Sequence, residues 1–264
     1  MLTLFDKRRK PVRGKLAFLS GCLALLAAAV MLPVPATAAE IRVAVASNFR
    51  PAMQVIAKRF ENQTGHEVIL IFGSTGKQFA QIQHGAPFDA FFAADSQRPA
   101  QLEQDGLAIA GTRFTYAVGK LVLWSPVAGY VDPVGEVLKT GDFKHLAIAN
   151  PELAPYGQAA QQVLKTSGLW ESLANRLVRG ENIVQAFQFV TSGSAELGFI
   201  AYAQIKQPGK PLKGSYWDIP QSLYSPIEQQ AVLLKDSEPA RAFLQFTQSW
   251  EALKIIGAFG YATP

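Results

Sequence analysis

Beyond an apolar N-terminal segment, hydrophobic and polar positions follow two alternating periods along the chain. Short runs of β-branched and aromatic residues predict strands, and apolar residues at helical spacing predict helices between them. In the first predicted helix, Met53, Ile56 and Phe60 fall on one face and Gly65 marks the end. The predicted strands are 41–47, 66–72, 89–95, 113–126, 145–150, 197–205 and 229–235, and the predicted helices are 51–65, 77–85, 156–168, 182–193 and 239–261.

The order of these elements predicts an α/β fold. Strand, helix, strand, helix and strand follow one another over residues 41–95, which indicates a mostly parallel sheet with helices on both faces. The apolar run 113–126 is long for a single strand and could pass from one lobe to another. We therefore expect two lobes with a ligand cleft between them. The first lobe would hold 40–119 and, after the return of the chain, 227–264, and the second would hold 120–226.

The N-terminal segment has the three parts of an export signal. Basic residues precede an apolar stretch at 16–32, and small residues follow, so we interpret 1–39 as a cleaved signal peptide. Cleavage would follow Ala38 or Ala39. A retained membrane anchor is an alternative, although the apolar stretch is shorter than the ~20 residues that a span prefers. A lipoprotein signal at Cys22 is another, although the most apolar part of the segment follows that cysteine.

The signal changes the interpretation of the net charge. The chain has 25 Lys and Arg against 20 Asp and Glu, a formal excess of +5. The first 39 residues hold six of these bases and one of these acids, 6 − 1 = +5, so the remainder is balanced. A neutral mature chain has no long-range field for nucleic acid, and we expect no such partner. Cys22 is the only cysteine, so the mature chain would have no disulfide, which the periplasm permits.

The loop after the strand 66–72 has the composition of an anion-binding turn. It reads GSTGK, but a nucleotide phosphate loop would need Gly in place of Ile71 and Ser or Thr in place of Gln78. What remains is a strand that ends in a turn of small polar residues, and a helix that begins at this turn. The unpaired N–H groups of a helix start bind anions without a cation. Alternatively, Ser74 or Thr75 serves only as an N-cap.

The same feature recurs at three other predicted helix starts. Ser47 and Asn48 follow the first strand, Tyr156 opens a helix in the second lobe, and Asn182 stands just before Ile183 at another. If all four starts face one cleft, they form a cage of neutral hydrogen-bond donors. Such a cage favours a fully ionised oxyanion, because each donor left unpaired costs ~1–3 kcal/mol.

At these residues the sequence resembles the periplasmic molybdate-binding proteins of ABC transporters, over about residues 41–261. The matching stretches are VASNF, FGSTGKQFAQI, HGAPFDAFFAAD, GKLVLWS, NPELAPYGQAA and ELGFIA. The resemblance implies a two-lobed type II periplasmic binding protein fold that closes over one tetrahedral oxyanion, molybdate or tungstate. It also implies a periplasmic monomer that delivers this ligand to an inner-membrane ABC permease. No cofactor, no catalytic residue and no direct metal ligand would be needed.

Carried over position by position, the resemblance also assigns the ligand contacts. These are Ser47, Asn48, Ser74, Thr75, Tyr156 and Ile183, the last two mainly through their backbone N–H groups. Some members of the family use a tyrosine hydroxyl at the position of Ala201. Here Tyr202 stands one residue later, and we expect it on the other face of the predicted strand.

Two alternatives remain. The ligand could be sulfate, phosphate or an organic anion, although a protonated phosphate would want an acceptor such as Asp, and none of the four loops offers one. A periplasmic enzyme on the same fold is the other alternative. The sequence contains neither G-x-S-x-G nor H-E-x-x-H, which argues against an enzyme without excluding it.

Overall fold

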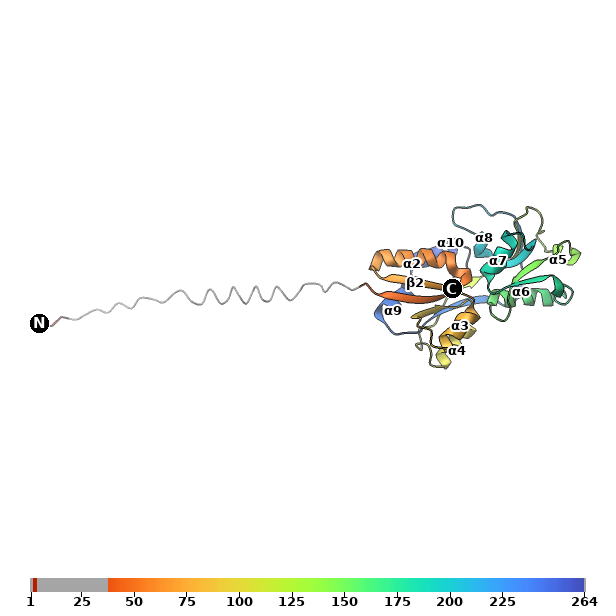
Figure 1. Ribbon diagram of the computed structural model, residues 1–264. Coiled ribbons are helices and arrows are strands. Elements are labelled where there is room, and N and C mark those ends of the chain that lie inside the picture. The colour runs from red at the N-terminus through yellow and green to blue at the C-terminus, as the bar shows by residue number, and fades with distance from the viewer. Residues whose placement is uncertain (1, 4–37, 264) are drawn as a thin grey trace. The chain divides into compact units, whose positions relative to one another are not determined.

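The computed structural model describes residues 2–3 and 38–263, and the residues from Ala38 onward form one compact unit (Figure 1). Almost all of the predicted signal peptide, including Cys22, lies outside the described residues. Among the helices that are described, none has the length and apolar character needed to cross a bilayer.

The first sheet has the order β2-β1-β3-β10-β4. β1 pairs in parallel with β2 and β3, whereas β10 runs antiparallel to both β3 and β4. Its strands are β1 Glu40–Ala46, β2 Glu67–Gly73, β3 Ala90–Phe92, β4 Phe114–Gly119 and β10 Ile227–Leu233.

The second sheet has the order β7-β6-β8-β5-β9 and is also mixed. β6 pairs in parallel with β7 and β8, and β5 is antiparallel to β8 and β9. The prediction of a mostly parallel sheet is therefore wrong in part. A parallel neighbour follows a helical crossover, whereas β5 and β10 enter their sheets directly after the chain crosses from the other sheet. The strands are β5 Leu121–Ser125, β6 Leu146–Ala149, β7 Leu177–Gly180, β8 Leu197–Ala201 and β9 Ser215–Asp218.

Helices cover both sheets, which gives the expected α/β class. Within α2, Met53, Ile56 and Phe60 are buried, and the left-handed Gly65 ends the helix with φ of 77°. Helices α2 and α10 lie side by side (Figure 1). The helices around the first sheet are α2 Arg50–Thr64, α3 Thr75–Gln83, α4 Gln97–Gln104, α9 Glu238–Thr247 and α10 Trp250–Ala258, and η1 Ser47–Phe49 is a 3₁₀ turn. Those of the second are α5 Val137–Thr140, α6 Pro155–Thr166, α7 Ile183–Thr191 and α8 Tyr202–Ile205, with the 3₁₀ turns η2 Ala174–Arg176 and η3 Gln221–Leu223.

Each sheet has its own hydrophobic core. Val43, Phe92 and Phe243 belong to the core of the first sheet, and Leu123 and Phe199 belong to that of the second. Ridges of helical side chains fill the space above each sheet, so burial rather than helix propensity stabilises these elements. Because the two cores hold the strands and helices together, the loops at the strand ends can contain polar residues.

The chain crosses between the sheets at two adjacent places. β4 ends at Gly119 in the first sheet and β5 begins at Leu121 in the second. The return runs from β9 to β10, whose first residue, Ile227, pairs with Gly119. Both connections therefore lie next to each other, as two strands of a hinge would.

Three predicted elements are divided in the structure, and the first is the strand 113–126, which is β4 and β5. The predicted C-terminal helix 239–261 is two helices, because Ser249 accepts the N–H of Ala252 at 3.2 Å and caps α10. The predicted strand 197–205 ends at Ala201, and α8 follows it. The expectation that Tyr202 lies on the other strand face is therefore wrong, because Tyr202 is the first residue of a helix.

Candidate functional site

The first candidate loop follows β1, where Ser47 and Asn48 are buried in the turn η1. The side-chain nitrogen of Asn48 donates to Gln229 Oε1 at 2.8 Å and to Tyr261 Oη at 3.2 Å. These two bonds use both hydrogens of the amide group. Asn48 can therefore offer a bound anion only its backbone N–H, whereas Ser47 lines a cleft.

The second loop follows β2 and starts α3. Ser74 is 2% exposed and Thr75 is 1% exposed. Within residues 38–263, the hydroxyl of Ser74 has no hydrogen-bond partner, although such a buried group normally has one. Thr75 Oγ1 accepts the N–H of Ala94 at 3.0 Å and keeps its own proton to donate. Two hydroxyl donors are thus held at one helix start.

A second unpaired atom lies close by in the sequence. Gln78 donates through Nε2 to the carbonyls of Val45 and Ile71, at 3.0 and 2.6 Å, and so ties β1 to β2. Its buried Oε1 has no partner among the described residues. This oxygen is an acceptor, so it adds nothing to the binding of a fully ionised oxyanion.

The third and fourth loops start α6 and α7. Asn182 Oδ1 accepts the N–H groups of Val184 and Gln185 at 3.0 and 3.2 Å, which leaves the N–H of Ile183 outside the cap. Tyr156 is the second residue of α6, so its N–H is one of those that a helix leaves without an internal partner. Tyr156 and Ile183 are buried. Each helix start therefore presents one backbone donor with the positive end of the helix dipole behind it.

The four starts meet in two pairs across the two sheets. α7 contacts η1, and Ser47 and Asn182 line the same cleft. The N–H of Gly76 in α3 donates to the carbonyl of Leu153, just before α6, at 2.8 Å. Contacts between the two sheets thus bring the helix starts together in these two pairs.

A buried polar network supports this arrangement. Gln229 Oε1 accepts from Tyr116 at 3.0 Å, and Gln229 Nε2 donates to the hydroxyl of Tyr156 at 3.3 Å. The hydroxyl of Tyr261 donates to the carbonyl of Asn48 at 2.9 Å. Burial raises the pKa of all three tyrosines well above its ordinary value, so they stay neutral at physiological pH.

Sequence reasoning named Asn48 and Tyr156 but missed the other members of this network, Tyr116, Gln229 and Tyr261. Gln229 and Tyr261 are far from the loops in the chain, and neither belongs to a motif that suggests an anion site. The one available signal was the pair of glutamines at the start of the predicted strand 229–235, since a buried amide needs partners.

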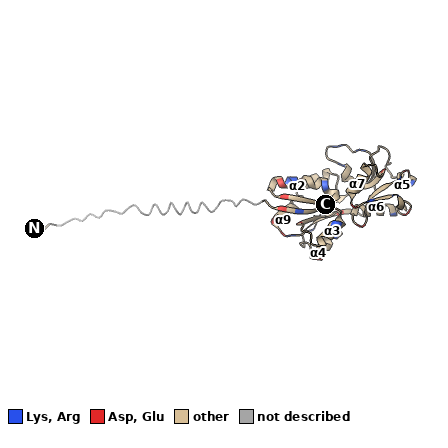
Figure 2. Cartoon of the chain, viewed as in Figure 1, with Lys and Arg blue, Asp and Glu red and all other residues tan. Residues whose placement is uncertain are grey.

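Charged residues beside the site are few. Lys77 and Glu181 form an ion pair at 3.1 Å between α3 and the start of α7. The guanidinium of Arg50 lies 4.0 Å from the ring centroid of Phe72. Elsewhere in the described part of the chain, residues of both signs are interspersed (Figure 2). The donors at the helix starts are hydroxyl and N–H groups, so they are neutral.

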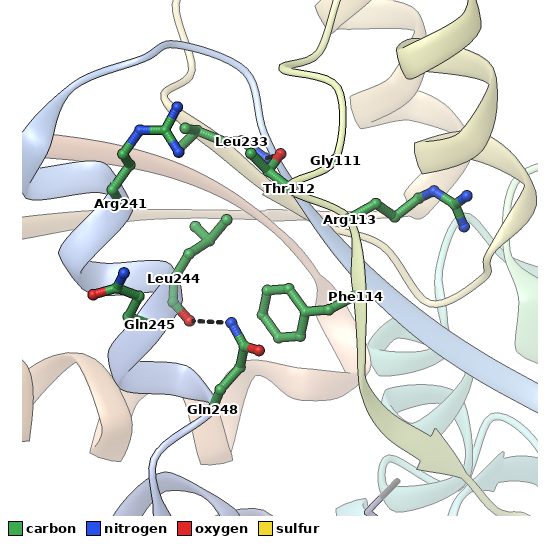
Figure 3. Close-up of a pocket in the computed structure, with 9 residues that line it drawn as sticks. All are labelled: Gly111, Thr112, Arg113, Phe114, Leu233, Arg241, Leu244, Gln245 and Gln248. Atoms are coloured by element: carbon green, nitrogen blue, oxygen red, sulfur yellow. Dashed lines mark hydrogen bonds between the residues drawn. The ribbon is translucent and has the colours of Figure 1, made fainter.

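A separate pocket of about 270 Å³ lies beside β4 and β10 of the first sheet (Figure 3). Its two arginines are already paired: Arg113 with Glu103 at 2.6 Å, and Arg241 with Asp236 at 2.5 and 2.8 Å. None of the predicted ligand residues lines it. We therefore place no oxyanion there. In the part of the chain that is described, no three His, Cys, Asp or Glu side chains come together as a metal site.

Comparison with known families agrees with the two-sheet architecture and shows to which class of protein the chain belongs. The family model described as "Bacterial extracellular solute-binding protein" matches residues 41–262. The chain belongs to this family. It is a binding protein rather than an enzyme, and the family works outside the cytoplasm.

The relatives of this solute-binding protein share most of its length. The molybdate-binding protein ModA of Azotobacter vinelandii is 53% identical over 88% of this chain and 93% of its own. ModA of Rhodobacter capsulatus is 47% identical over 90% of this chain and 94% of its own. The solved structure of the periplasmic molybdate-binding protein of Azotobacter vinelandii aligns with a TM-score of 0.82 at 43% identity, over 85% of this chain and 99% of that one. The predicted α/β binding-protein fold is confirmed.

Proposed function

We propose that this solute-binding protein captures molybdate or tungstate and delivers it to an ABC permease in the inner membrane. Two relatives at 53% and 47% identity are named for molybdate binding. The observation in this chain that supports the proposal best is the buried hydroxyl of Ser74, which has no partner among the described residues. An anion at the start of α3 would give this group its missing acceptor.

The six predicted residues would share the ligand in two ways. Ser47, Ser74 and Thr75 would donate through their hydroxyls. Asn48, Tyr156 and Ile183 would donate through backbone N–H groups, since the side chains of the first two are bonded within the core. Such neutral donors fit an ionised tetrahedral oxyanion, and none of the six residues has a carboxylate to accept a ligand proton.

The lobes would close over this ligand. We propose that 40–119 and 227–264 move against 120–226, bending at Gly119 and at the return into β10. The hydrogen bond from Gly76 to Leu153 and the ion pair of Lys77 with Glu181 would form on closure.

The proposal extends to the cellular setting. A signal peptide at 1–39 would export the chain to the periplasm, and the protein would act there as a monomer. Intact-mass spectrometry of the exported protein would show whether cleavage follows Ala38 or Ala39.

Thermal unfolding of the ligand-free mature protein tests the ligand. Molybdate, tungstate, sulfate and phosphate are added in turn. A ligand at a thousand times its dissociation constant stabilises the folded state by ~4 kcal/mol, a shift of about 8–16 °C for a chain of this size. We expect such shifts with molybdate and tungstate only. A shift with sulfate or phosphate instead would replace the ligand, and no shift with any of the four would refute the oxyanion proposal.

A further inference from the structure

A cleft of about 180 Å³ includes one residue of the candidate site, Ser47. Ser47, Arg50 and Phe72 line it from the first lobe, and Glu181 and Asn182 line it from the second. Since Ser47 is one of the proposed ligand residues and Asn182 caps α7, an anion in this cleft would lie beside two of the helix starts.

Arg50 is the cation in this cleft that has no acidic partner. Its side chain is exposed, its guanidinium is stacked on Phe72, and none of the ion pairs within residues 38–263 includes it. Glu181, the carboxylate that faces the same cleft, is neutralised by Lys77. The mouth of the cleft therefore carries one uncompensated positive charge.

The place of Arg50 in its helix is unfavourable for stability. It is the first residue of α2, where the helix dipole disfavours a cation. Stacking on Phe72 holds the guanidinium in position without neutralising it. The stacking contact offsets at most the unfavourable interaction with the helix dipole, so it leaves the charge of Arg50 available to an anion.

We propose that Arg50 is a capture residue, which draws the oxyanion into the cleft before the neutral donors bind it. This inference rests on the proposed function. The field of a full charge reaches farther than that of a hydroxyl or an N–H dipole, so Arg50 acts on the encounter. Because the side chain is exposed and stacked on Phe72, it contributes to the association rate and little to the dissociation rate.

The test compares Arg50→Gln with Arg50→Lys and with Lys58→Gln. Lys58 is an exposed cation on the same helix, two turns away, so its replacement makes the same change in net charge outside the cleft. Titration calorimetry with molybdate gives the dissociation constant. Exchange of bound, isotope-labelled molybdate against an excess of unlabelled ligand gives the dissociation rate, and the two together give the association rate. Unfolding of each ligand-free variant checks that it is folded.

We expect Arg50→Gln to lower the association rate about three- to tenfold at low ionic strength, and less than about twofold at 0.5 M salt, where screening removes the effect. The dissociation rate should stay within about twofold. Arg50→Lys should keep most of the wild-type rate, because it keeps the charge, and Lys58→Gln should match the wild type.

Other results overturn the inference in distinguishable ways. If the wild type binds molybdate but Arg50→Gln associates as fast as Lys58→Gln, Arg50 is not a capture residue. If Arg50→Gln changes only the dissociation rate, Arg50 holds the bound ligand or the closed lobes instead. If the wild type binds neither molybdate nor tungstate, the proposed function fails, and the inference fails with it.

Discussion

At the scale of single residues, the start of α3 contains two hydroxyls with different hydrogen bonds. Ser74 keeps a buried hydroxyl without a partner, whereas Thr75 already bonds the N–H of Ala94. A buried polar group without a partner lowers stability, so Ser74 is costly in the ligand-free protein. The two neighbours therefore differ in what their hydroxyls do before a ligand binds.

This difference makes a prediction. Ser74→Ala should weaken molybdate binding by about 1–2 kcal/mol, roughly a five- to thirtyfold rise in the dissociation constant, and should leave ligand-free stability unchanged or higher. Thr75→Ala should weaken binding similarly and also lower ligand-free stability, because the N–H of Ala94 loses its acceptor. Calorimetric titration and urea unfolding measure the two effects. Ser172→Ala, at an exposed serine, is the control, and equal affinities for all three variants would show that the pocket is assigned wrongly.

At the scale of elements, the close approach of α6 to the end of β4 links the site to the crossing between sheets. A Cβ added to Gly119 would lie 2.2 Å from the hydroxyl oxygen of Tyr156, a distance that real contacts do not reach. Gly119 also pairs with Ile227 at the return crossing. Its lack of a side chain therefore lets Tyr156 reach Gln229 beside the proposed hinge.

We accordingly expect Gly119→Ala to destabilise the protein by about 1–3 kcal/mol through overpacking. Adding Tyr156→Phe should restore part of the loss, because it removes the nearest clashing atom. Gly257→Ala is the matched control: it lies inside α10 with open space around it and should be neutral or stabilising by up to ~1 kcal/mol. Chemical denaturation of the four proteins gives the free energies, and a harmless Gly119→Ala would contradict the described contact.

At the scale of the whole molecule, residues from distant parts of the chain form the polar core. Tyr116 lies in β4, Tyr156 starts α6, and Tyr261 follows α10, yet all three belong to one buried network with Gln229. Desolvation by burial is the largest cause of their raised pKa values. The raised pKa values are thus a property of the folded chain alone.

The raised pKa values predict alkaline destabilisation. In the unfolded chain the tyrosines ionise near pH 10, whereas in the folded chain they keep their protons to higher pH. Above pH 10 the folded state binds more protons than the unfolded state, so the free energy of unfolding falls as pH rises, by up to ~1.4 kcal/mol per pH unit for each tyrosine. Urea unfolding between pH 8 and 11 measures this slope. Tyr261→Phe should reduce the slope by about one proton, and a slope equal to that of the wild type would contradict the burial of Tyr261.

Part of the molecule could be predicted from local sequence. The period of apolar positions predicted β1, α2, β2 and most other long elements, because each buries one continuous face against a core. The short elements β7, β9, α4 and α5 were missed, because four to eight residues hold too few apolar positions to define a period. Tyr202 was placed in a strand because the apolar run continues past Ala201, while the turn into α8 depends on Gln204 accepting the N–H of Ala201 at 2.9 Å.

The sequence by itself determined the class of the protein and the polar residues at four helix starts. Those features are local: a Gly/Ser/Thr turn after a strand needs only its neighbours to present N–H groups. The tertiary structure alone decided which donors remain available, since Asn48 loses its amide hydrogens to Gln229 and Tyr261, residues separated from it by 181 and 213 positions. Hydrogen bonds between such distant residues depend on the packing of two sheets, and no local pattern encodes that packing.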